Sequence, residues 1–213
     1  MIRKLDKTFF SALLQQHGFK KRGLTWNQCS GDIVRVVDYQ ISKFSSSDRI
    51  DFTINLGIWM RPVWAVYTGR QAPKFIKEGD CWPSYRIGQV LADFRSDAND
   101  LWWTVTSEDE VERTGGEVCT MMSDKCLPFL NRFRSIEDVK RFYDTVGLRL
   151  MPGGKLYLAI LSHLLGDRVA YDRLIAEFTD KRLSAWQPKV EEVIRRLHNW
   201  GNKEEGNTST GSG

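Results

Sequence analysis

Two segments in which apolar and polar residues alternate decide the fold. They are residues 33–43, Ile-Val-Arg-Val-Val-Asp-Tyr-Gln-Ile-Ser-Lys, and residues 50–59, Ile-Asp-Phe-Thr-Ile-Asn-Leu-Gly-Ile-Trp. A polar loop over residues 44–49 joins them. If Lys43 faces Ile50, apolar residues meet across the two strands: Ile41 with Phe52, Tyr39 with Ile54, and Val37 with Leu56. A register shift of one residue would mix the apolar and polar sets, because side chains alternate between faces. The pattern predicts an antiparallel hairpin with one apolar face.

A third strand precedes this hairpin. Residues 24–29 again alternate with a period of two, and Ser30-Gly31 is typical of a tight turn. Continuing the pairing outward from that turn gives an antiparallel meander with two further contacts: Trp26 with Arg35, and Leu24 with Val37.

The N-terminal segment has the spacing of an amphipathic helix. Between residues 5 and 16, apolar side chains recur at steps of three and four, and Gly18 stands where a left-handed cap would end the helix. This helix can cover the apolar side of the meander. The predicted core is Phe9, Leu13, Val37, Tyr39, Phe52, Ile54 and Leu56.

The rest of the chain is predicted to be mostly helical. Prolines and glycines break any long period over residues 60–100, and short strands are expected only around residues 85–91 and 101–105. From Thr106 onward helical patterns dominate, although Gly115-Gly116 and Pro128 are expected to interrupt or kink them.

The predicted fold class is α+β: an antiparallel β-meander sheet covered by an N-terminal helix and followed by a helical C-terminal region. We expect an α+β domain over residues 1–150, a helical extension over 151–201 and a flexible tail over 202–213. The last helix is expected to start at Pro188 and to end at Gly201.

Composition excludes several classes of protein. The chain has 213 residues, with 31 basic and 27 acidic side chains, and it contains no apolar stretch of 18 residues. The first residues do not resemble a signal peptide, so a cytoplasmic protein without a membrane partner is expected. The cysteines are far apart and form no C-x-x-C pair, which predicts reduced thiols and no metal site: Cys29, Cys81, Cys119 and Cys126.

No catalytic motif is recognisable. Gly153-Gly154-Lys155 lacks the other residues of a phosphate-binding loop, and no nucleophile elbow or dinucleotide-binding glycine motif occurs. A metal-dependent nuclease would need a lysine near position 42, where this chain has Ser42. Neither a cofactor nor a catalytic residue is predicted, and whether the chain is an enzyme stays open.

The candidate binding residues are polar and aromatic. Four short polar side chains share the hairpin face opposite the core, either as a solvated surface or as a recognition surface with fixed donors and acceptors. Adjacent Trp102 and Trp103 must point to opposite faces, so that one packs in the core and the other can anchor a partner. The complete candidate set is Asp38, Gln40, Thr53, Asn55, Trp59, Arg86, Trp102 and Trp103.

Several short motifs, in order, resemble the bacterial domain of unknown function 4304. They are Gly18-Phe19-Lys20-Lys21, Val36-Val37-Asp38-Tyr39-Gln40, Phe52-Thr53-Ile54-Asn55-Leu56-Gly57, Cys81-Trp82, Arg86-Ile87-Gly88 and Asp100-Leu101-Trp102-Trp103. The similarity covers about residues 5–145 and implies an α+β fold in a bacterial cytosol. It supplies no activity and no catalytic residues, and the segment from Pro152 onward departs from the family.

Two functions from different classes are consistent with these features. The first is a non-catalytic protein-binding module, an immunity, defence or regulatory component by analogy with other small bacterial domains. The second is a nucleic-acid-binding or nucleic-acid-processing protein. Residues 1–79 carry 13 basic and 6 acidic side chains, and their largest basic cluster is Lys20-Lys21-Arg22. Exposed aromatic residues among these basic ones would favour the second function.

Overall fold

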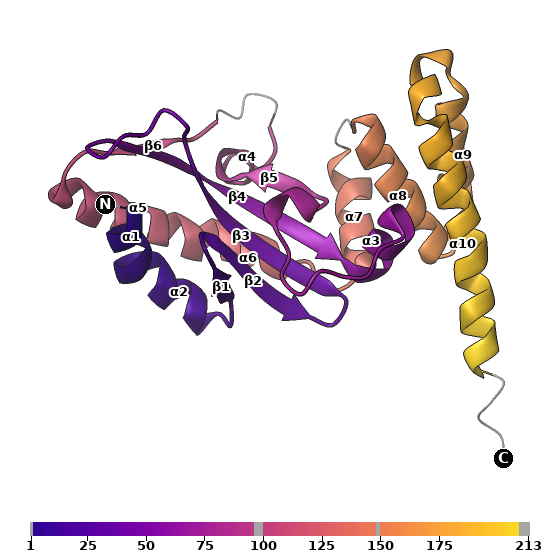
Figure 1. Ribbon diagram of the computed structural model, residues 1–213, viewed down its shortest axis with the longest axis horizontal. Helices are drawn as coiled ribbons and strands as arrows, with labels where there is room; N and C mark the ends of the chain where they lie inside the picture. Colours follow the sequence, from indigo (N-terminus) through magenta and orange to yellow (C-terminus); the bar gives the residue numbers. More distant parts are fainter. Residues whose placement is uncertain (1, 96–99, 148–149, 209–213) are drawn as a thin grey trace. The chain divides into compact units, whose positions relative to one another are not determined.

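A computed structural model describes residues 2–95, 100–147 and 150–208 (Figure 1). The chain forms two compact units, each described here by itself. The first contains Met1–Trp59 and Pro73–Ser135, and the second contains Met60–Ala72 and Ile136–Gly213. A compact unit is not necessarily an independently folding domain, so the expected boundary at residue 150 stays a prediction. Within the described residues, no helix combines the length and the apolar character needed to cross a membrane.

The first unit is built on an antiparallel sheet, which confirms the predicted α+β class. Its strands follow in the order β1 (Lys20–Arg22), β2 (Thr25–Ser30), β3 (Ile33–Ile41), β4 (Ile50–Met60) and β5 (Ser84–Arg86), and β6 (Trp103–Val105) pairs with another part of β4. At the loop end of the hairpin, the Ser42 N–H donates to the Asp51 carbonyl at 2.8 Å, as the predicted register of β3 and β4 requires.

The register between β2 and β3 differs from the prediction by two residues. Trp26 pairs with Val37 rather than with Arg35, and the turn consists of Gly31 and Asp32. Gly31 has a φ of 59°, and glycine adopts this left-handed conformation without a steric penalty. Because a shift of two residues preserves the faces, Trp26 still points into the core and is fully buried.

The N-terminal helix has a different phase from the predicted one. A π-helical turn (η1, Asp6–Phe10) separates α1 (Ile2–Leu5) from α2 (Ser11–Gln16) and shifts the buried stripe by one position. Phe9 and Leu13 are therefore only half-buried, whereas Phe10 and Leu14 are buried. The five predicted core residues of the hairpin are confirmed, with exposures of 3 % or less: Val37, Tyr39, Phe52, Ile54 and Leu56.

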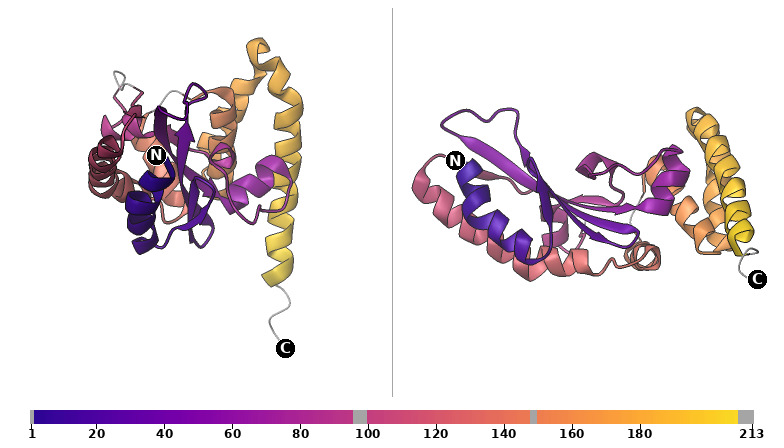
Figure 2. Two further views of the ribbon diagram at one scale, coloured as in Figure 1. Left: turned by 60° about the vertical axis from the view of Figure 1, so that its left-hand side comes forward. Right: turned by 60° about the horizontal axis from the view of Figure 1, so that its bottom comes forward.

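The helix α5 (Glu108–Met121) lies beside the N-terminal helical segment along one face of the sheet (Figure 2). Ser107 caps α5 by accepting a hydrogen bond from the Glu110 N–H at 3.3 Å. The expected interruption at Gly115 does not occur: this glycine is buried, and a Cβ atom there would lie 2.3 Å from the Phe9 ring. A glycine is tolerated here because it leaves room for that ring.

The first unit also contains three short helical elements, one after strand β5 and two after helix α5. The predicted strand around residues 85–91 ends at Arg86, because the Gln89 side chain accepts the Arg86 N–H at 2.9 Å and caps α4 (Ile87–Leu91). After α5, a second π-helical turn (η3, Met122–Cys126) leads into α6 (Leu127–Asn131). Pro128 occupies the first turn of α6, where its missing N–H has no helical partner to lose.

The second unit is helical. Its elements are α3 (Arg61–Thr68), α7 (Ile136–Val146), α8 (Pro152–Leu164), α9 (Arg168–Ala176), the 3₁₀ turns η4 (Glu177–Thr179) and η5 (Lys181–Trp186), and α10 (Gln187–Thr208). As predicted, Gly166 follows the end of α8, and the Asp167 carboxylate caps α9 by accepting the Ala170 N–H at 3.0 Å. Helix α10 continues beyond Gly201, because one glycine weakens a helix without ending it. Of the expected tail, residues 209–213 lie outside the described residues.

The π-helical turn predicts unequal costs for two adjacent leucines. Leu14→Ala should lower the free energy of unfolding by about 2–5 kcal/mol, since Leu14 is fully buried. Leu13→Ala is the matched control and should cost roughly 1 kcal/mol or less, because Leu13 is only half-buried. Urea denaturation of both variants measures the difference. An equal or larger cost for Leu13 would mean that the helix keeps a continuous α-helical phase.

Candidate functional site

The polar face of the hairpin is partly covered by the segment that contains η2 (Glu78–Asp80). The Asn27 side chain donates to the Ile76 carbonyl at 2.9 Å and accepts the Ile76 N–H at 2.7 Å. Cys81 lies over Gly57, where a Cβ atom would approach its Sγ to 2.7 Å. The sheet around Asn27 and Gly57 is therefore covered by this segment.

Two of the predicted binding residues are used inside the protein. Thr53 is fully buried, and its hydroxyl donates to the Leu101 carbonyl at 2.7 Å. Asn55 is 6 % exposed, and its amide donates to the Gln40 Oε1 at 3.0 Å. Buried polar groups need such partners, so these two side chains stabilise the covered face rather than present donors to a partner.

Asp38 and Gln40 are half-buried and remain accessible in part. The Asp38 carboxylate accepts a hydrogen bond from the Thr25 hydroxyl at 2.6 Å. It also lines a pocket of about 430 Å³ together with Arg22, Phe75, Lys77 and Glu78. The pocket mixes both signs of charge with one aromatic ring, and sequence reasoning missed it because its residues come from three separate segments.

Arg86 and Trp102 come together beside Asn55. Arg86 pairs with Asn55 across β5 and β4, and its guanidinium lies 5.2 Å from the centre of the Trp102 ring. The Asp100 carboxylate accepts the Trp102 indole N–H at 2.9 Å and lies 3.4 Å from the Arg86 Nε. The Arg86 Nη1 is enclosed but has no hydrogen-bond acceptor among the described residues.

The two other predicted tryptophans belong to the core. Trp59 is 2 % exposed, and Trp103 is 6 % exposed and stacks on Phe52 with ring centres 5.5 Å apart. The expectation that one of Trp102 and Trp103 packs inward is therefore confirmed. Trp102 itself precedes β6 and is half-buried, which leaves part of its ring accessible.

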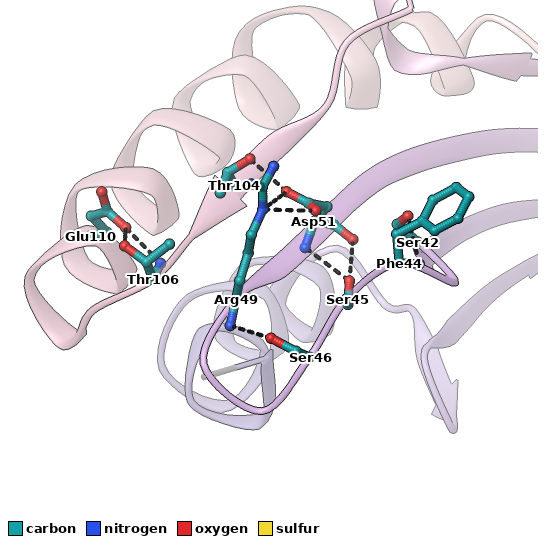
Figure 3. A network of polar contacts seen from close by, with 9 residues as sticks. All are labelled: Ser42, Phe44, Ser45, Ser46, Arg49, Asp51, Thr104, Thr106 and Glu110. Carbon is teal, nitrogen blue, oxygen red and sulfur yellow. Dashed lines mark hydrogen bonds and ion pairs between the residues drawn. The ribbon is translucent and has the colours of Figure 1, made fainter.

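The hairpin loop is fixed by a network of side-chain hydrogen bonds (Figure 3). The Asp51 carboxylate accepts hydrogen bonds from the Arg49 Nε at 3.1 Å and from the Thr104 hydroxyl at 2.6 Å. The bond from Thr104 connects the loop to β6. The hydrogen bond from Thr104, with help from Arg49, holds the pKa of Asp51 below its usual value. Phe44 in this loop is 79 % exposed, with the Lys43 ammonium 5.0 Å from its ring centre.

The basic cluster Lys20-Lys21-Arg22 forms the exposed edge strand β1. The Lys21 ammonium makes an ion pair with Asp6 and lies 5.2 Å from the centre of the Trp26 ring. The neighbouring aromatic residues are buried, with Phe19 3 % and Trp26 0 % exposed. Phe19 and Trp26 therefore offer no surface on which bases could stack, and the half-buried ring that accompanies Arg22 is Phe75, in the pocket described above.

The cysteines are free thiols and occupy different environments. Cys29 is exposed, Cys81 and Cys119 are half-buried, and Cys126 is buried. Burial raises the pKa of the Cys81 and Cys119 thiols, and it raises the pKa of Cys126 to about 12. Across the described residues, no three His, Cys, Asp or Glu side chains are grouped in a way that could hold a metal ion.

Fold and site together define an α+β protein that carries an accessible arginine–tryptophan pair at the edge of a largely covered polar face. The chain belongs to the family of the domain of unknown function DUF4304, whose family model matches residues 10–132. The match ends before the helices α7 to α10, in agreement with the departure expected from Pro152 onward. No curated protein and no solved structure matches the chain.

The internal role of Thr53 predicts a measurable loss of stability. Thr53→Val keeps the shape of the side chain but leaves the Leu101 carbonyl without its donor. The free energy of unfolding should therefore fall by about 1–2 kcal/mol. Thr8→Val removes a hydroxyl from an exposed position of η1 and should change stability by less than about 0.5 kcal/mol. Thermal unfolding of both variants compares them. A neutral Thr53→Val would mean that water replaces this hydrogen bond.

Thiol reactivity should follow burial. Because raised pKa values reduce the thiolate fraction at pH 8, Cys81, Cys119 and Cys126 should react slowly with a disulfide reagent, whereas exposed Cys29 should react quickly. Mass spectrometry of the labelled peptides assigns the rates, and labelling in denaturant gives the unprotected reference. Rapid labelling of Cys81 in the folded protein would contradict the covered end of the polar face.

Proposed function

We propose that the chain is a non-catalytic protein-binding module and that Arg86 and Trp102 are the centre of its recognition surface. The observation that carries this proposal is the state of the Arg86 guanidinium. It is held by its stack on Trp102 and by Asp100, and the side chain is still 34 % exposed. An arginine that is both oriented and partly exposed can bind a partner's oxygen atom through its accessible N–H groups.

The chemistry of this pair suits a protein partner with a carboxylate. An arginine that is already oriented loses less rotamer freedom when it binds, and its planar fork matches a carboxylate group. Arginine and tryptophan are also the residues that most often dominate the energy of protein interfaces. Asp38 and Gln40 lie on the same face of the sheet and are accessible in part. Asp38 adds a carboxylate acceptor to the proposed surface, and Gln40 adds an amide.

The nucleic-acid alternative has weaker support. Its basic residues lie on β1, where Lys21 is already paired with Asp6 and the rings of Phe19 and Trp26 are buried. Phosphate binding through Lys20 and Arg22 alone would be sequence-independent and sensitive to salt. The bacterial and cytoplasmic setting belongs to this proposal through the family resemblance. The immunity, defence or regulatory role rests on analogy with other small bacterial domains.

Affinity purification from a bacterial lysate tests the proposed surface. Wild-type protein should retain a defined protein, and both Arg86→Ala and Trp102→Ala should reduce its recovery at least about tenfold, as expected for central interface residues. Arg132→Ala is the control, because Arg132 is an exposed arginine at the end of α6. Quantitative mass spectrometry measures recovery, and circular dichroism verifies that each variant is folded.

Salt separates the two functions. Retention of a protein partner through one arginine–tryptophan centre should survive an increase from about 50 to 200 mM salt, whereas binding through several phosphates falls by orders of magnitude over that range. The proposal is wrong if the retained material is nucleic acid that dissociates with salt. It is equally wrong if folded Arg86→Ala and Trp102→Ala recover the partner as well as Arg132→Ala does.

A further inference from the structure

The pocket beside Asp38 lies on the first three strands of the sheet and has a volume of about 430 Å³, within the range of small-molecule sites. Arg22 pairs with Thr25 across β1 and β2, and Thr25 pairs with Asp38 across β2 and β3. Directly opposite residues of antiparallel strands share a face, so these three side chains form one row across the sheet. The segment of residues 75–79 supplies most of the remaining lining.

Two carboxylates of the lining are held by neutral hydroxyl groups. Asp38 accepts the Thr25 hydroxyl at 2.6 Å, and Glu78 accepts the Ser84 hydroxyl. Burial, followed by nearby charges that include Glu78 and Asp38, raises the pKa of the Cys81 thiol, which places both carboxylates near one point. The second oxygen of each carboxylate has no partner within the described part of the chain. This side of the pocket can therefore accept hydrogen bonds from an ammonium group.

Two positive charges line the same pocket. Arg22 and Lys77 are exposed, and neither side chain has a hydrogen-bond or ion-pair partner among the residues that the structure describes. Charges of both signs thus share the pocket without forming ion pairs with one another. A ligand that carries an ammonium and a carboxylate would contact both sets at once, whereas a ligand with a single charge would leave one set without a partner.

The uncharged part of the lining favours an apolar group on this ligand. Phe75 contributes a half-buried aromatic ring, which attracts other aromatic and apolar groups. A Cβ atom at Gly23 or at Gly79 would meet no other atom within 4 Å, so both positions leave open space. We propose that the pocket binds a free α-amino acid with a large apolar side chain. Its ammonium contacts the two carboxylates, its carboxylate contacts the two cations, and its side chain packs on Phe75.

This ligand is a small molecule, so its binding goes beyond the proposed function and does not rest on it. Asp38 is the residue that the pocket shares with the proposed recognition surface. Titration with a pure amino acid needs no protein partner, and affinity purification needs no added amino acid. A failure of one experiment therefore leaves the outcome of the other unaffected.

Isothermal titration of the full chain with L-phenylalanine and three related compounds tests this proposal at about 150 mM salt, where remote charges are screened. L-Phenylalanine should bind saturably. L-Phenylalaninamide lacks the carboxylate and N-acetyl-L-phenylalanine lacks the ammonium, so each should bind at least about tenfold more weakly. These two compounds also represent the N-terminal and C-terminal residues of a peptide. Glycine lacks the apolar group and should also bind at least about tenfold more weakly.

Two variants separate the two sets of charges. Asp38→Asn keeps an acceptor for the Thr25 hydroxyl but removes the negative charge, and Arg22→Gln removes a positive charge from the opposite set. Each should weaken L-phenylalanine about tenfold through the loss of charge-assisted hydrogen bonds. Arg22→Gln should change the affinity for L-phenylalaninamide by less than about twofold, because that compound has no carboxylate to lose.

Arg132→Gln is the matched control, since Arg132 is an exposed arginine outside the pocket lining. It should change the affinity for L-phenylalanine by less than about twofold, and circular dichroism should show that all variants are folded. An absence of saturable binding up to about 10 mM L-phenylalanine overturns the proposal. Equally tight binding of any of the three related compounds also overturns it, as does an Arg132→Gln effect as large as that of Arg22→Gln.

Discussion

The burial of the β3–β4 hairpin on both of its faces is the constraint on which the first unit depends. On the apolar face, Tyr39 stacks on Phe10 with ring centres 4.4 Å apart and planes inclined by 5°. On the opposite face the strands carry polar side chains, which the chain itself covers. Each covered polar group therefore needs a partner within the protein, and Asn27 and Thr53 find theirs in backbone groups of distant segments.

The accessible surface follows from where this cover ends. Residues 76–81 cover the end of the face near Gly57, and Leu101 covers Thr53, but Arg86 and Trp102 lie at the margin. A side chain at such a margin is held by its neighbours and still reaches solvent. This combination orients both side chains while part of each still contacts solvent, and an oriented side chain loses less freedom if it binds.

The sequence predicted the hairpin because side-chain alternation constrains a strand at every residue. It could not predict the phase of the first helix, because Leu5, Phe9 and Leu13 also have regular α-helical spacing. The π-helical turn that buries Phe10 instead has no local signal in the residues around it. Its phase follows from tertiary packing, since η1 and α5 contact one another and share one face of the sheet.

The candidate site was predictable in part for the same reason. Alternation assigned Asp38, Gln40, Thr53 and Asn55 to one face, but it carries no information on what covers that face. The covering segment lies within residues 60–100, where prolines and glycines break any long period from which its path could be predicted. Only coordinates show that Thr53 donates to the Leu101 carbonyl and that Asn55 donates to the Gln40 side chain.

Glycine illustrates the difference between a local signal and a tertiary one. In a single sequence, Gly115 within α5 and Gly57 within β4 look like residues that weaken their elements. Both instead lie where a neighbouring side chain touches the backbone: Phe9 at Gly115 and Cys81 at Gly57. The cost of each glycine to its own element is offset by a contact that a Cβ atom would prevent. The same residue type therefore permits close contact in the layer on each face of the sheet, and so helps to set which polar groups stay accessible.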